Sequence, residues 1–142
     1  MVKSNTLYNL TKAERQKLIK RLASLLEDDE KILFAYLHGS FNEETAFRDL
    51  DIAVYLQQMP SDKMLLYELK LEEDLQSALH YPIDLKALNS APPHFCYMVI
   101  KKGVKLIVRD DQKRVAFEMR TLKKYFDFEP IRRRYLQEVN NA

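Results

Sequence analysis

Two aspartates stand at the head of a short apolar segment, and their spacing suits a metal ion. Asp49 and Asp51 are two residues apart where the apolar run 50–56 begins, and this run is typical of a strand. Because side chains alternate across a strand, both carboxylates leave the same face. Carboxylates this close repel each other unless a cation lies between them, and their oxygens suit Mg²⁺ or Mn²⁺. The pair indicates a metal centre able to bridge the phosphates of a nucleotide.

A glycine and a serine end the preceding apolar run, residues 32–37, and are suited to hold phosphate. Gly39 is one of only two glycines, and without a Cβ atom its backbone allows a ligand to approach closely. Ser40 adds a backbone N–H and a hydroxyl, and a short helix from Phe41 onward would add partial positive charge. His38, just before them, is expected to pack at the end of a strand.

Two charged residues complete the candidate site, and each has two readings. Asp84 lies in the apolar stretch 82–88, where an unpaired charge is costly, so metal binding or proton acceptance would explain it. Its alternative is a carboxylate at the strand end that faces solvent or pairs with Lys86. Arg48 either steadies a phosphate beside the metal or pairs with an acidic residue at 43 or 44.

Strands and helices alternate along the chain. Apolar runs predict four strands, and apolar residues at steps of three and four predict helices before, between and after them. The order is helix, strand, strand, helix, strand, helix, strand, helix, which is typical of an α/β domain around a mixed sheet. The predicted strands span residues 32–37, 50–56, 82–88 and 104–108.

Particular residues mark the predicted ends of three helices. Thr11 and Glu14 have the capping-box pattern at the start of the first helix. Ser61 is expected to cap the second helix with its side chain. Gly103 follows two lysines and is expected to end the third helix in a left-handed conformation.

The last helical segment, residues 111–140, is predicted to pack on the rest of the domain. Pro130 does not fit a helix interior, so we expect a break or kink at 128–130 and a second helical piece beyond it. The side chains expected to form the stripe before that point are Val115, Met119, Leu122 and Phe126.

Composition limits the class of protein. The 142 residues suit a single domain, and their longest apolar runs are far too short to span a membrane. The first residues start no signal peptide, so we expect a cytoplasmic protein. Cys96 is the single cysteine, which excludes an internal disulfide and a cysteine-based zinc site. A net charge of +2 with interspersed signs disfavours nucleic acid as the main partner.

The motif resembles the signature of the minimal nucleotidyltransferases of the DNA polymerase β superfamily. That signature is Gly-Ser, a spacer, Asp-x-Asp and a third acidic residue on a later strand. The resemblance implies the polymerase β-like nucleotidyltransferase fold, with about four strands packed with helices. It also implies that Gly39 and Ser40 contact nucleotide phosphates and that Asp49 and Asp51 bind divalent metal. Asp84 would assist metal binding or activate the acceptor hydroxyl.

The resemblance covers most of the chain, from about residue 18 to residue 139, and implies one domain over residues 1–142. Many stand-alone members resemble antitoxins paired with a HEPN ribonuclease, and some transfer AMP from ATP to a tyrosine of the toxin. The resemblance therefore implies a metal-dependent enzyme that modifies a tyrosine hydroxyl of a HEPN toxin. The spacer, residues 41–48, is shorter and more acidic than is usual in that family.

Two other readings remain open. A small-molecule or tRNA nucleotidyltransferase would need a second chain to supply its substrate domain. Alternatively, the chain is an antitoxin or scaffold that acts by binding alone, without catalysis. Oligomeric state, whether homo- or hetero-oligomeric, stays open as well. In the binding-only reading, the interface residues would be Tyr125, Phe126, Phe128, Ile131 and Tyr135.

Overall fold

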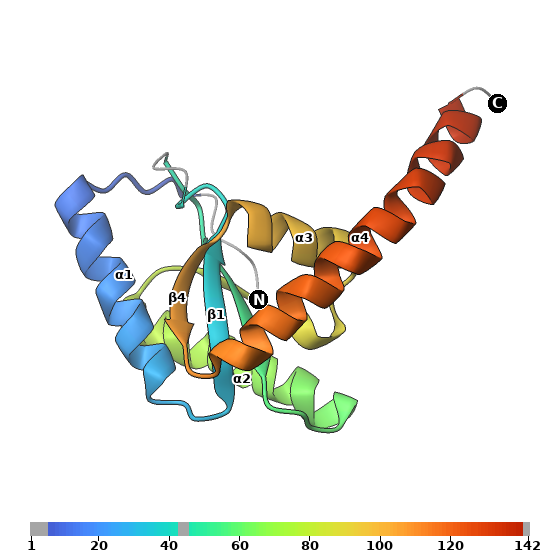
Figure 1. Cartoon of the computed structure of the whole chain (residues 1–142). Helices are drawn as coiled ribbons and strands as arrows, with labels where there is room; N and C mark the ends of the chain where they lie inside the picture. The colour runs from blue at the N-terminus through green and yellow to red at the C-terminus, as the bar shows by residue number, and fades with distance from the viewer. Residues whose placement is uncertain (1–5, 43–45, 141–142) are drawn as a thin grey trace.

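The structure, a computed structural model, describes residues 6–42 and 46–140. Helices and strands follow one another in the predicted order, and the second and fourth strands have the predicted bounds (Figure 1). In chain order the elements are α1 (Lys12–Glu27), β1 (Ile32–His38), β2 (Leu50–Leu56), α2 (Ser61–Leu79), β3 (Ile83–Ala87), the 3₁₀ helix η1 (Leu88–Ser90), α3 (Pro93–Lys102), β4 (Val104–Val108) and α4 (Asp111–Asn140).

The four strands form the predicted mixed sheet, in the order β3-β2-β1-β4. Strand β1 pairs antiparallel with both β2 and β4, whereas β2 and β3 are parallel and α2 makes the crossover between them. The starts of two parallel strands lie at the same edge of a sheet. Residues at the head of β2 and the head of β3 are therefore neighbours, although the sequence separates them widely.

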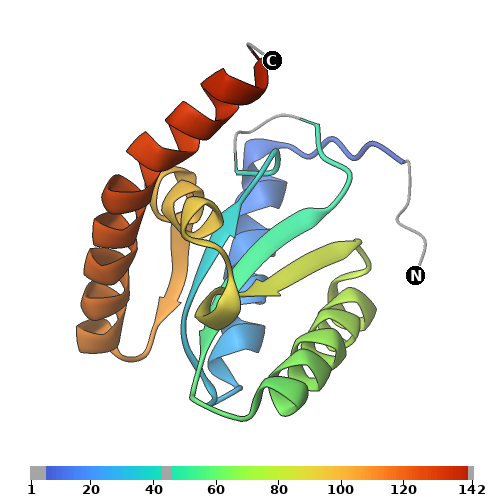
Figure 2. The same cartoon turned by 90° about the vertical axis from the view of Figure 1, so that its right-hand side faces the viewer.

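Helices cover both faces of the sheet, which gives two apolar clusters (Figure 2). Leu22 of α1 and Leu75 of α2 belong to the cluster on one face, together with Ile52 of β2. Val99 of α3 and Phe117 of α4 belong to the cluster on the opposite face. Because side chains alternate along β2, the strand contributes to both clusters and is buried along most of its length.

Of the predicted helix ends, one is confirmed and two are wrong. The capping box of α1 is present, with the Glu14 N–H donating to Thr11 Oγ1 at 3.2 Å. Ser61 is the first helical residue of α2, and Pro60 occupies the N-cap without a side-chain hydrogen bond. Gly103 is extended, with φ of −79°, because the chain passes straight from α3 into β4. A Cβ atom there would clash with the Val99 carbonyl oxygen and lie 3.3 Å from the Leu37 carbonyl oxygen, so close packing explains this glycine.

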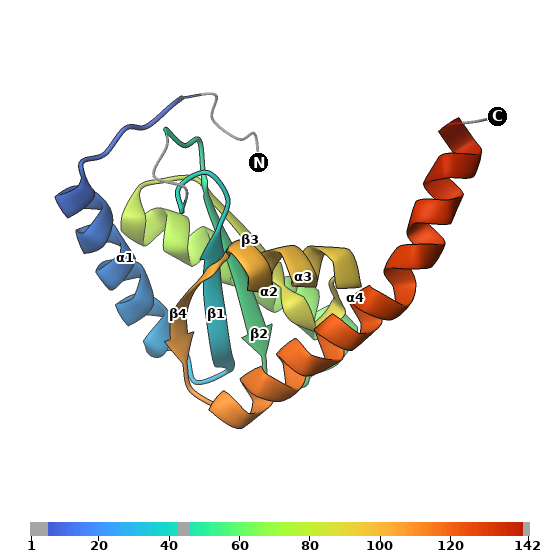
Figure 3. The same cartoon turned by 45° about the horizontal axis from the view of Figure 1, so that its top comes forward.

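Helix α4 runs without interruption through Pro130, so the predicted break is absent. Figure 3 shows its axis bending along its length, as a proline inside a helix favours. The predicted core stripe is also wrong, because Val115, Met119, Leu122 and Phe126 are all exposed. Phe117 and Thr121 are buried instead. No helix in the described part of the chain is long and apolar enough to cross a membrane.

Candidate active site

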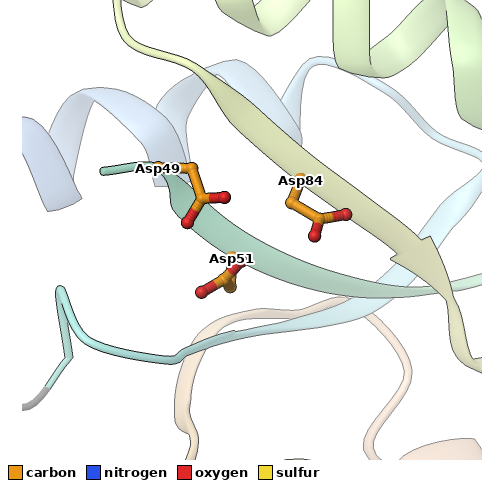
Figure 4. Close-up of side chains that lie close together, drawn as sticks. All are labelled: Asp49, Asp51 and Asp84. Atoms are coloured by element: carbon orange, nitrogen blue, oxygen red, sulfur yellow. The ribbon is translucent and has the colours of Figure 1, made fainter. Parts of the chain in front are cut away.

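The three aspartates that the sequence singled out converge at one edge of the sheet (Figure 4). Asp49, Asp51 and Asp84 are half-buried, and each offers a carboxylate oxygen within 4.8 Å of the others. Asp51 and Asp84 are register partners across the parallel pair β2–β3, and Asp49 comes one residue before β2. The parallel pairing thus explains why a residue of β3 joins the Asp-x-Asp pair.

The aspartates lie on the face of the sheet that α3 and α4 cover. Asp51 alternates in phase with Ala53, which belongs to the cluster beneath α3 and α4. His38 at the end of β1 is the register partner of Asp51, so His38, Asp51 and Asp84 form a row across three strands. The candidate site is therefore open toward the same side of the molecule as α3 and α4.

His38 packs at the strand end, as expected, and its ring meets the Phe95 ring of α3 edge-on at 5.6 Å. Burial lowers the pKa of His38, while the carboxylates of Asp84 and Asp49 act in the opposite direction. Its Nε2 atom is buried and has no hydrogen-bond partner among the described residues. A neutral imidazole at this position shapes the site without adding charge.

Gly39 begins a tight turn in which its carbonyl oxygen accepts the Asn42 N–H at 3.1 Å. Its φ of +79° lies in the left-handed region that disfavours side chains, and a Cβ atom there would meet the Asp51 carboxylate. Ser40 is half-buried in the same turn. Residues 39–42 are not helical, so the short helix considered after Phe41 is absent there, and residues 43–45 lie outside the described residues.

Arg15, which no motif in the sequence indicated, contacts the two ends of the spacer. Arg15 of α1 is only 7% exposed, and its Nη1 donates to the Phe41 carbonyl oxygen at 2.7 Å. The guanidinium also lies over the rings of Phe41 and Phe47, 4.9 and 5.6 Å from their centroids. Arg15 thereby ties α1 to both ends of the segment between Ser40 and Asp49.

The alternative ion pairs considered for Asp84 and Arg48 have different outcomes. Lys86 Nζ lies 4.0 Å from Asp84 Oδ1, but its side chain is 58% exposed, so this ion pair is weak. Arg48 is exposed on the approach to Asp49. Its alternative partners, Glu43 and Glu44, lie outside the described residues. A phosphate contact by Arg48 stays a prediction.

The donor set suits a divalent cation that prefers oxygen. Three carboxylates from two neighbouring strands point at a common space (Figure 4), and hard cations bind such oxygens together with substrate phosphates. Gly39 places a turn of backbone directly beside this space. The arrangement combines a place for a metal ion with a place for phosphate groups.

Comparison with known protein families identifies this arrangement. Residues 20–112 match the family described as Polymerase beta, Nucleotidyltransferase. The chain belongs to this family. The matched segment runs from within α1 to the first turn of α4 and includes the turn at Gly39 and all three aspartates. The predicted nucleotidyltransferase fold is thus confirmed.

This nucleotidyltransferase is also similar to chains in solved toxin–antitoxin complexes. One is a tri-AMPylated HEPN toxin from Shewanella oneidensis with MNT antitoxin, at 27% identity over 88% of this chain and 98% of that chain, with a TM-score of 0.71. Another is a toxin–antitoxin structure with AMP-PNP, at 27% identity over 86% and 97% of the two chains, also with a TM-score of 0.71.

A third similar structure is an MntA–HpeT variant in which two aspartates, two positions apart, are replaced by glutamate. It has 25% identity over 85% of this chain and 97% of that chain, with a TM-score of 0.73. The comparison with curated proteins found no match. The solved complexes confirm the resemblance to minimal nucleotidyltransferases of the antitoxin type.

Proposed function

We propose that this chain is an antitoxin that transfers AMP from ATP to a tyrosine hydroxyl of a partner HEPN toxin. The observation that carries the proposal is the convergence of Asp49, Asp51 and Asp84 within 4.8 Å beside the turn at Gly39. Similar chains occur in a complex with a tri-AMPylated HEPN toxin and in a structure with AMP-PNP. These two complexes supply the acceptor class and the donor nucleotide of the proposal.

Each site residue has a role in the proposed reaction. Asp49, Asp51 and Asp84 hold Mg²⁺ or Mn²⁺, since their oxygens suit such a cation. When bound, the cation neutralises phosphate charge. The backbone at Gly39 and Ser40 contacts the nucleotide phosphates. Arg48, exposed at the rim, reaches a phosphate from outside.

The proposed transfer balances without any further reactant. The tyrosine oxygen attacks the α-phosphorus of ATP and forms a new P–O bond, while the bond from that phosphorus to the bridging oxygen breaks. Pyrophosphate leaves with the electron pair of the broken bond. The Asp84 carboxylate is the group assigned to accept the hydroxyl proton, because it lies on the strand next to Asp51.

The proposal treats residues 1–142 as one nucleotidyltransferase domain, with the segment 111–140 packed on it. Contacts of the Phe117 ring with the rings of Phe34 and Tyr55, at 5.5 and 5.3 Å between centroids, support α4 as part of that domain. The proposed reaction belongs in the cytoplasm, since it consumes ATP.

A transfer assay tests the proposal. Purified chain is mixed with α-labelled ATP, Mg²⁺ and the product of the adjacent gene, which the proposal expects to be a HEPN protein, and label is expected on a tyrosine of that protein. The double variant Asp49→Asn, Asp51→Asn should lose transfer by about a thousandfold or more, because two of the three carboxylates are gone. Asp74→Asn is the matched control, since that exposed carboxylate pairs with Lys70 on α2.

Two outcomes would contradict the proposal. One is the absence of label transfer with every nucleoside triphosphate, and the other is equal transfer by the double variant. If the double variant transfers no label and still neutralises the toxin as well as the wild type, the chain acts by binding alone.

A further inference from the structure

The second half of α4 carries a row of apolar side chains that the described chain leaves uncovered. Phe128, Ile131, Tyr135 and Val139 are 50%, 64%, 65% and 52% exposed. They recur at steps of three and four residues, so they share one face of the helix. We call these four residues the α4 stripe.

The α4 stripe prolongs the buried face of the same helix. Phe117 and Thr121, the buried residues of the first half, are 4% and 5% exposed, and the same spacing leads from them through Lys124 to Phe128. At the junction an apolar hollow of about 410 Å³ is lined by Pro93 of α3, Phe128 and Ile131, among others. A core-facing row that continues beyond the body is typical of a helix that a second helix completes.

Energetics favour a covering partner as well. The end of α4 projects from the body (Figures 1 and 3), and residues 133–140 are all exposed. An isolated helix of so few residues is marginal in water. Pro130 lies just before these residues and disfavours the helix further. Burying the four side chains of the α4 stripe against a second helix would offset both effects.

The α4 stripe lies where a partner would approach the aspartates. Helix α4 covers the same face of the sheet from which Asp51 projects. Figure 1 shows its free end projecting away from the sheet, at the end of the molecule where β1 ends and β2 begins. A protein docked on the α4 stripe therefore lies on the side of the sheet that carries the candidate site.

The charge of α4 distinguishes between two occupants of the α4 stripe, a second copy of this chain and a different protein. Residues 123–140 contain five basic and three acidic residues, so two copies packed through this segment would bring positive charge against positive charge. We propose that the α4 stripe is the docking surface for an amphipathic helix of the partner toxin that carries acidic residues beside its apolar face. This inference rests on the proposed function for the identity of the partner.

Binding measurements with matched variants test the inference. Ile131→Asp with Tyr135→Asp places two carboxylates on the α4 stripe, whereas Gln137→Asp with Asn140→Asp places two on other faces of the same turns. Affinity for the HEPN protein of the transfer assay should fall at least about thirtyfold in the first variant and change less than about threefold in the second. Affinity for Mg²⁺·AMP-PNP should stay unchanged in both, and circular dichroism checks that α4 persists.

Three results would overturn the inference. The first is unchanged affinity of the stripe variant for the HEPN protein. The second is a wild-type dimer, seen by light scattering, that the stripe variant loses, because the occupant would then be a second copy. The third is binding to anionic vesicles that only the stripe variant loses, with HEPN affinity intact.

The proposed function and the docking surface fail separately. Tight binding of the HEPN protein that depends on the α4 stripe, without AMP transfer, would contradict the proposed function and support the α4 stripe as a docking surface. AMP transfer by both proteins, with equal affinity of the stripe variant and the wild type for the HEPN protein, would support the proposed function and contradict the docking surface.

Discussion

A Cβ atom at Gly39 would lie 2.9 Å from Cγ of Asp51. The φ of +79° at this glycine adds strain for any other residue, of about 1–2 kcal/mol. Gly39→Ala should therefore lower the free energy of unfolding by about that amount or more. It should also reduce AMP transfer about a hundredfold, because the Asp51 carboxylate must move. Urea unfolding and the transfer assay measure the two effects.

A double-mutant cycle separates two effects of Gly39→Ala, the steric overlap of its Cβ atom with Asp51 and the backbone strain. Asp51→Ala removes the carboxylate, so the stability losses of Gly39→Ala and Asp51→Ala should sum to more than the loss in the double variant. Simple additivity would mean that only the backbone conformation matters at Gly39.

Removal of divalent metal should lower the melting temperature of the wild type but not that of the Asp49→Asn, Asp51→Asn variant. A divalent cation held by the three aspartates binds the native state, so Mg²⁺ at ten times its dissociation constant should add about 1.4 kcal/mol of stability. Thermal unfolding with EDTA and with Mg²⁺ measures this difference. Asp49→Asn with Asp51→Asn should show the same melting temperature in both buffers. Equal stabilisation of the double variant would place the cation elsewhere.

Arg15 should act on the nucleotide through the spacer. Arg15→Met leaves the buried Phe41 carbonyl without its donor, which costs about 1–3 kcal/mol, and loosens the turn that holds Ser40. We expect the KM for ATP to rise more than kcat falls. Arg21→Met is the control, because Arg21 is on the same helix and donates to the exposed Ala78 carbonyl.

A conservative variant shows whether the effect at Arg15 is one of positioning. Arg15→Lys keeps the charge and one donor, so it should recover part of the affinity for ATP. If Arg15→Met changes only the free energy of unfolding, with KM and kcat as in the wild type, Arg15 has a purely structural role.

Stability should fall at high pH because of one thiol. Burial raises the pKa of Cys96 to about 11, so the folded chain keeps the thiol proton where the unfolded chain has lost it. The contribution is complete below pH 9 and declines between pH 9 and 11, by about 2–3 kcal/mol at most. Urea unfolding at pH 8, 9 and 10 should show a shallower decline for Cys96→Ala. Identical pH profiles would contradict this assignment.

The strands and the Asp49–Asp51 pair could be predicted because each depends on local pattern. The run 50–56 is apolar and bounded by polar residues, and β2 has these bounds. The placement of Asp84 beside Asp51 needed the parallel pairing of β2 with β3. Periodicity does not give that pairing, and the family resemblance supplied the link to Asp84 instead.

Other features depend on tertiary contacts that no local pattern encodes. Arg15 occupies a helix position that a charged residue normally turns to solvent, and only the fold brings the rings of Phe41 and Phe47 beneath it. In α4 the apolar residues occupy several faces, so periodicity selected Met119 where the sheet actually meets Phe117.

The crossover between β2 and β3 also sets when the site can exist. Asp49 and Asp51 leave the ribosome before Asp84, because α2 lies between β2 and β3 in the chain, and Asp84 joins them only when β3 pairs with β2. Until that long-range contact closes, a nascent chain has only two of the three metal ligands. The proposed metal site therefore becomes complete only after β3 has emerged from the ribosome and paired with β2.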